Sequence, residues 1–151
     1  MLYLLFQIGN DRYALEASHA AEVIPFIALK KILHAPRGVA GIFNYHGKPV
    51  TALDLCELTV GRPARERLST RIILVKFSDP SGRERVVGLI AEHATEIMRR
   101  DERDFVSPGV KVAAAPYLGP VVMDEKGVIQ LLRASGFAAM AGDVEALQDA
   151  K

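Results

Sequence analysis

The chain has 151 residues, the usual size of one domain, and its 19 lysines and arginines nearly balance 18 aspartates and glutamates, for a net charge of +1. Because basic and acidic residues are interleaved, no broad field favours nucleic-acid phosphates or anionic lipid, and we expect neither as a partner. Apolar runs are far shorter than the roughly 20 residues of a membrane-spanning helix, Cys56 has no second cysteine to pair with, and the N-terminus lacks a secretory leader, so we expect a cytoplasmic protein.

The first elements are predicted to be a β-hairpin and a short helical turn. Apolar side chains alternate over residues 2–8, residues 9–11 supply a turn, and a second strand begins near Tyr13. Ser18 is expected to cap a helical turn that runs through Val23 and ends before Pro25, because the residue before a proline is pushed out of the helical region.

A second hairpin is predicted around His46-Gly47, which lies between two apolar stretches. A two-residue turn of this kind needs positive φ at both central residues, which glycine accepts freely and histidine tolerates. Pro49 removes a ladder donor, so the returning strand should have an open edge there. Asp54 is then expected to cap a helix, with Glu57 three residues later in a reciprocal capping box.

The rest of the chain repeats the pattern of short strands joined by turns. Strands are predicted over 71–77 and 85–91, with a turn at 79–82, and over 117–123 and 128–132. Many short strands favour a barrel or sandwich, and the polar segment 61–67 suggests a division into two compact halves. Residues 99–115 are interpreted as a solvated loop.

The C-terminal residues change pattern, because apolar side chains there recur every three or four residues. This spacing predicts a helical tail with one apolar face, made of Phe137, Met140, Val144 and Leu147.

No catalytic, cofactor or metal site is predicted. The histidines at 19, 34, 46 and 93 lack the spacing of a zinc site, and no nucleophile elbow, phosphate loop or dinucleotide fingerprint occurs. Cys56 follows the Asp54 cap, where a helix N-terminus lowers a thiol pKa, but a free cysteine is more often a small buried side chain.

An ordered series of segments from Leu2 to about Leu132 resembles the CheW-like family of chemotaxis coupling proteins. The matching segments are Leu4–Gly9, Tyr13–Leu15, Glu22–Val23, Ala35–Pro36, Gly41–Gly47, Pro49–Val50, Leu53–Leu55, Val87–Ile90 and Tyr117–Gly119.

The resemblance implies an all-β fold of two SH3-like five-stranded β-barrel subdomains that share a core, with short helices. It places the CheW-like domain, with its two barrel subdomains, at residues 1–133, and the helical tail predicted from the apolar spacing then takes residues 134–151. It also implies a non-enzymatic adaptor that couples the tips of methyl-accepting chemoreceptors to the regulatory domain of a CheA-type histidine kinase. Such an adaptor reaches membrane receptor arrays through its partners, and apolar side chains at the barrel ends contact the kinase.

By the same resemblance, five residues fall on the receptor-binding side, in the groove between the barrels: Glu22, Val23, Asn44, His46 and Val87. The family usually has Asn-Leu-Arg-Gly where this chain has Asn44-Tyr45-His46-Gly47, so a permanent cation is replaced by histidine, the residue type whose charge can change near physiological pH. This departure suggests a particular receptor in a dedicated or alternative pathway, and an affinity that rises on acidification if His46 contacts a receptor carboxylate.

Two other classes of function stay open on the residues alone. One is a small β-barrel module that binds nucleic acid, which needs a basic, aromatic groove. The other is an enzyme that depends on a reactive Cys56 or His46.

Overall fold

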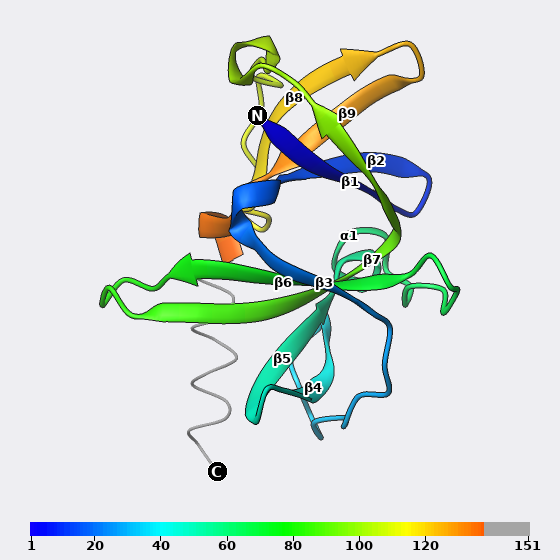
Figure 1. Cartoon of the computed structure of the whole chain (residues 1–151), viewed down its shortest axis with the longest axis vertical. Coiled ribbons are helices and arrows are strands. Elements are labelled where there is room, and N and C mark those ends of the chain that lie inside the picture. Colours follow the sequence, from blue (N-terminus) through cyan, green and yellow to red (C-terminus); the bar gives the residue numbers. More distant parts are fainter. Residues whose placement is uncertain (138–151) are drawn as a thin grey trace.

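The computed structural model describes residues 1–137, which form nine β-strands, one short α-helix and three 3₁₀ helices (Figure 1). Within this part of the chain, no helix is long and apolar enough to cross a membrane. The elements in chain order are β1 (Leu2–Ile8), β2 (Asp11–Glu16), η1 (Ala17–His19), β3 (Ala20–Pro25), β4 (Val39–Tyr45), β5 (Lys48–Asp54), α1 (Leu55–Val60), β6 (Arg71–Ser78), β7 (Glu84–Arg99), η2 (Glu102–Asp104), β8 (Leu118–Asp124), β9 (Gly127–Leu132) and η3 (Ala134–Phe137).

The strands form two five-stranded barrels that share one long strand. The order in the first barrel is β7-β1-β2-β9-β8, and in the second it is β3-β6-β7-β5-β4. β7 belongs to both because its first half pairs with β6 and β5, whereas its second half pairs with β1. Figure 1 shows β7 passing from the lower barrel to the upper one. The expected all-β fold of two SH3-like barrels is confirmed.

Both barrels follow one pairing plan, and each draws strands from both halves of the chain. The hairpin β1–β2 packs with β7, β8 and β9, while the hairpin β6–β7 packs with β3, β4 and β5. In each case the second strand of the hairpin makes a parallel pair, β2 with β9 and β7 with β5. The division at 61–67 therefore separates two sequence halves that are interleaved in space, not two separate barrels.

The apolar core has three parts, and the largest lies between the barrels. Phe43 and Ile72 belong to the cluster inside the second barrel, and Tyr3 and Ile129 to the cluster inside the first. The cluster between them takes side chains from both: Leu4, Phe6, Ile8, Tyr13, Leu15, Leu53, Leu55, Cys56, Ile73, Val75, Phe77, Val87, Leu89, Ala91, Ala94, Tyr117, Leu132, Ala134 and Phe137. The shared core expected from the family resemblance is therefore present.

The helical turn predicted from Ser18 to Val23 is wrong beyond its first residues. Only Ala17–His19 forms a 3₁₀ turn, and residues 20–25 form β3. The reason is non-local: β3 pairs with β6, which places Val23 opposite the buried Ile73. β7 likewise extends to Arg99, past the predicted end at 91, because its second half pairs with β1.

The Asp54 cap is confirmed, but the capping box is not reciprocal. One oxygen of Asp54 accepts hydrogen bonds from the backbone N–H groups of Cys56 (2.9 Å) and Glu57 (3.2 Å). The N–H of Asp54 itself donates to the carbonyl of Gly38 at 2.7 Å, so this donor is already used and does not bond to the Glu57 carboxylate. The cap starts α1, which carries Cys56 in the core.

The C-terminal part of the described chain is also in the core. Phe137 of η3 is fully buried and its ring stacks on Tyr117, with 4.8 Å between centroids. The other three residues of the predicted apolar helical face, Met140, Val144 and Leu147, lie outside the described residues.

Candidate partner-binding surfaces

The tip of the β4–β5 hairpin is an exposed polar turn. His46 has φ of 51° and Gly47 has φ of 82°, as the turn requires, and the Asn44 side-chain oxygen accepts the Gly47 N–H at 2.8 Å. Pro49 lies opposite Asn44, whereas β5 pairs with β7 only from Ala52 onward. The strand therefore has an open edge at Pro49, as predicted.

Glu22 of β3 meets this tip from the other side. Its carboxylate accepts a hydrogen bond from the Tyr45 hydroxyl at 2.6 Å, and the same oxygen lies 3.7 Å from Nε2 of His46. The rings of Tyr45 and His46 are in edge-to-face contact, with 4.3 Å between their centroids. The hydrogen bond to Glu22 raises the pKa of Tyr45. Sequence analysis assigned no role to Tyr45, since nothing in the pattern placed it near Glu22.

The structure does not bring all five receptor-side residues together. Glu22 and His46 are in contact, and Asn44 belongs to the same hairpin tip. Val23 is 38% exposed and lies on the opposite face of β3 from Glu22, on the side of Ile73 and the layer between the barrels. Val87 is on that same side but only 4% exposed, so it lies under the surface.

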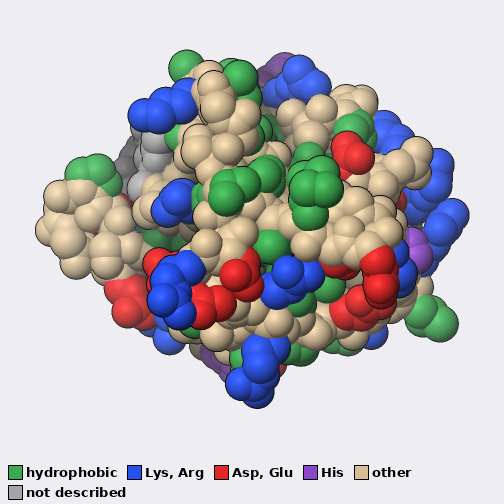
Figure 2. Space-filling model, turned by 90° about the horizontal axis from the view of Figure 1, so that it is seen from above, with side chains coloured by type: hydrophobic (Ala, Val, Ile, Leu, Met, Phe, Trp, Pro, Cys, Tyr) green, Lys and Arg blue, Asp and Glu red, His purple; other side chains and the backbone are tan. Residues whose placement is uncertain are grey.

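Exposed apolar side chains occur at the ends of both barrels. In the second barrel they are on two loops, with Ile27 39%, Leu33 84% and Leu68 94% exposed. In the first barrel, Met123 and Val128 face each other across the β8–β9 hairpin and are 65% and 54% exposed. Figure 2, viewed from the β8–β9 end, shows apolar side chains near the middle of that face with charged side chains around them. Apolar groups with a polar rim are typical of surfaces that contact proteins.

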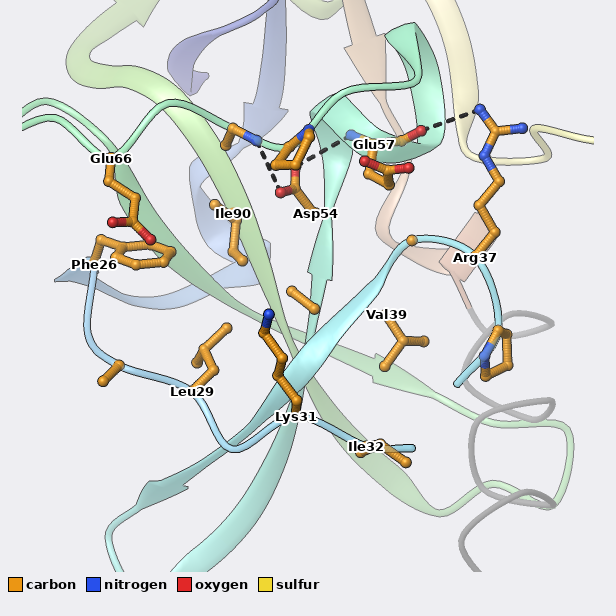
Figure 3. A pocket seen from close by; sticks show the side chains of 16 residues that line it. Phe26, Leu29, Lys31, Ile32, Arg37, Val39, Asp54, Glu57, Glu66 and Ile90 are labelled. Atoms are coloured by element: carbon orange, nitrogen blue, oxygen red, sulfur yellow. Dashed lines mark hydrogen bonds between the residues drawn. The ribbon is translucent and has the colours of Figure 1, made fainter. Parts of the chain in front are cut away.

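A pocket of about 630 Å³ lies at the second barrel, between the loop that joins β3 to β4 and the segment around α1 (Figure 3). Its apolar lining comprises Phe26, Ala28, Leu29, Ile32, Pro36, Val39, Ala40, Pro63, Ala64 and Ile90. The loop wall carries Lys31 and Arg37, and the opposite wall carries Glu57 and Glu66. Figure 3 shows the Lys31 side chain projecting from the loop into the pocket. The two walls therefore have opposite charge over an apolar floor.

The wall around α1 is held by two buried carboxylates. Glu92 accepts hydrogen bonds from both terminal nitrogens of Arg62, at 3.2 and 3.3 Å, and from the Arg65 N–H at 2.7 Å. Asp54 accepts the Ala64 N–H at 2.9 Å with its second oxygen. Burial alone raises the pKa of Glu92, but these hydrogen bonds outweigh it and lower the pKa. Sequence analysis assigned no role to Glu92, because a single charge carries no signal of a distant partner.

Cys56 is fully buried, and burial raises the pKa of its thiol to about 11. A thiol in this state is inert, because the thiolate is the nucleophile. Within residues 1–137, no group of three or more His, Cys, Asp or Glu side chains is arranged to hold a metal ion. The described residues thus form a double barrel with an exposed polar hairpin tip and exposed apolar side chains at the barrel ends.

Comparison with known proteins specifies the family. The sequence matches the CheW-like domain over residues 2–141. It is 22% identical over 96 residues to the chemotaxis protein CheW of Klebsiella aerogenes. The matched stretch covers 64% of this chain but only 55%, about half, of the length of the Klebsiella protein. The crystal structure of the scaffolding protein TtCheW from Thermoanaerobacter tengcongensis superimposes with a TM-score of 0.76 at 22% identity, over 91% of this chain and 86% of that one. The chain belongs to the CheW-like domain family.

Proposed function

We propose that this chain is a non-enzymatic adaptor that couples the cytoplasmic tips of methyl-accepting chemoreceptors to the regulatory domain of a CheA-type histidine kinase. The observation that carries the proposal is the match to the CheW-like domain over residues 2–141. An adaptor holds two partners in register and so contributes binding free energy and effective concentration. It works in the cytoplasm, joins receptor arrays through its partners, and serves a dedicated or alternative pathway.

The receptor-facing surface in this proposal is the β4–β5 tip together with β3. Glu22 and His46 offer side chains that are 46% and 76% exposed, and Asn44 adds an exposed amide. Val23 extends the surface toward the layer between the barrels. Val87 supports this surface from beneath, because it is buried.

The kinase-facing surface in this proposal is the pocket and its apolar rim at the end of the second barrel. Leu33 and Ile27 are exposed on the loop that forms one wall, and the pocket has room for an apolar anchor from a partner. From Val23 to Leu53 the chain has no acidic residue but carries Lys30, Lys31, Arg37 and Lys48. A kinase segment with an apolar anchor and flanking carboxylates fits this wall.

The test is co-purification of the chain with a receptor-tip fragment and a kinase regulatory domain, first singly and then together. We expect a ternary complex. Leu33→Asp should weaken kinase binding at least about tenfold with receptor binding retained, because a buried carboxylate lacks a partner in an apolar contact. Glu22→Arg should do the reverse. Val110→Asp, at an exposed site (70%) in the loop between η2 and β8 that the proposal assigns to neither surface, is the control. Failure of both partners to bind contradicts the proposal.

The two alternative classes find no support. The buried Cys56 with its raised pKa is unsuited to nucleophilic chemistry. The nearly balanced charge lacks the basic footprint of a nucleic-acid-binding surface.

A further inference from the structure

The second barrel has a seam between β3 and β4, where the loop after β3 bonds to β4 through the backbone of Lys30 and Ile42 (2.9 and 2.8 Å), whereas β3 itself reaches the hairpin tip through side chains. Its outer strands are β3 and β4, and no ladder joins them in the described part of the chain. The hydrogen bond from the Tyr45 hydroxyl to Glu22 crosses this seam. The contact therefore fixes the hairpin tip relative to the edge of β3.

One oxygen of Glu22 faces two side chains, the neutral hydroxyl of Tyr45 and the imidazole of His46, which can take up a proton. The Tyr45 hydroxyl, at 2.6 Å, makes a hydrogen bond, whereas Nε2 of His46, at 3.7 Å, is beyond hydrogen-bond reach of the same oxygen. The left-handed backbone of His46 and its ring contact with Tyr45 hold the imidazole beside the carboxylate. A neutral imidazole gains little from Glu22, but an imidazolium is attracted to it.

The other charged groups around the tip do not cancel this attraction. Lys48 of β5 lies opposite Tyr45 and is exposed, so solvent screens its repulsion of an imidazolium. Asn44 is neutral, and its side-chain oxygen is engaged by the Gly47 N–H. Glu22 is the carboxylate in contact with His46.

We propose that Glu22, Tyr45 and His46 form a proton-dependent clasp across the seam between β3 and β4. Protonation of His46 draws the imidazolium onto Glu22, tightens the hairpin tip against β3, and withdraws the Glu22 carboxylate from a partner. The first two effects concern the free protein, and the third rests on the proposed receptor surface. The carboxylate that attracts a protonated His46 is therefore Glu22 of the same chain. Acidification should lower the affinity for a partner that contacts Glu22.

The clasp is tested in the free protein by following the ring signals of His46 by NMR between pH 5 and 8. In Glu22→Gln, we expect proton affinity at His46 to fall about threefold, within the range of exposed ion pairs. His19, 3.9 Å from Glu16, is a matched internal control. Its midpoint should move in Glu16→Gln and stay in Glu22→Gln. Identical His46 midpoints in the wild type and Glu22→Gln overturn the proposal.

The effect on binding is tested with the receptor-tip fragment at pH 5.5 and 8. We expect wild-type affinity to be about threefold lower at pH 5.5, the same small coupling. His46→Asn should show no such change, because asparagine tolerates the left-handed backbone and does not titrate. Equal pH dependence in the two proteins overturns the withdrawal of Glu22. If the fragment binds neither at any pH, the proposed receptor surface fails while the NMR result still decides the clasp.

Discussion

Glu92 is a buried carboxylate that ties the segment after α1 to the shared strand. Glu92→Ala removes the partner of Arg62 and leaves the Arg65 N–H without its acceptor. Because Arg62 keeps access to solvent, we expect a loss of about 1–3 kcal/mol in the free energy of unfolding. Urea denaturation measures it, and Arg67→Ala, on the same segment, is the control. If Glu92→Ala lowers the free energy of unfolding no more than Arg67→Ala does, Glu92 does not stabilise the fold through its bonds to Arg62 and Arg65.

The same residue has a pH signature. Its pKa is lowered in the folded protein, so its contribution is complete above the ordinary glutamate value of about 4.3 and is lost as pH falls through the folded value. Wild-type stability should therefore decline in acid, and the difference between wild type and Glu92→Ala should shrink there. A difference that stays constant from pH 7 to pH 3 rules out this origin.

Cys56 gives a prediction about reactivity. Because burial raises its pKa to about 11, the thiol should resist alkylation at pH 8 in the folded protein and react fully in urea. Timed labelling with a thiol reagent measures both rates. Rapid labelling of the folded protein would restore the thiol-dependent enzyme as a candidate.

At the scale of elements, Asp54 connects a helix start to a loop. Asp54→Asn keeps an oxygen for the N–H groups of Cys56 and Glu57 but is expected to lose the bond from Ala64, at about 1 kcal/mol. Asp54→Ala loses all three and should destabilise by about 2 kcal/mol or more, at the upper end for caps. Thermal or urea unfolding of the pair gives the order. Equal losses contradict the split roles of the two oxygens.

Most strands follow from sequence because their signals are local. The turn at His46-Gly47 and the alternation over residues 2–8 need only neighbouring residues, and both hairpins form. β3 escapes prediction because Ala20 and Ala21 carry little strand preference and its conformation is set by pairing with β6. The long β7 escapes for the same reason, since its second half depends on β1.

The candidate site is predictable only in part. The family resemblance indicates Glu22, Asn44 and His46, but not the hydroxyl of Tyr45 that holds Glu22. The pocket escapes as well, because its walls come from a loop and a helix that the chain separates. Contacts between side chains on distant elements leave no periodic signal in a single sequence.

At the scale of the whole molecule, the interleaving of the halves explains why the domain is one unit. The parallel pairs of β2 with β9 and of β5 with β7 each join early strands to late ones. Such pairing must close long loops, at a cost in chain entropy, before its contacts add stability. We therefore expect slow, cooperative folding in which neither barrel is stable alone. Unfolding followed by two probes, one in each barrel, should give coincident transitions, and separate midpoints would contradict it.

The interleaving also decides what happens when the backbone is severed. A cut after Arg67, beside Leu68, which is 94% exposed, leaves one fragment with β1–β5 and another with β6–β9, and each lacks strands that complete both barrels. Alone, each piece should be unstructured, but mixed they should recombine into a nicked protein with a native spectrum. By the same pairing, two intact molecules at high concentration can exchange their β6–β9 halves and form domain-swapped dimers.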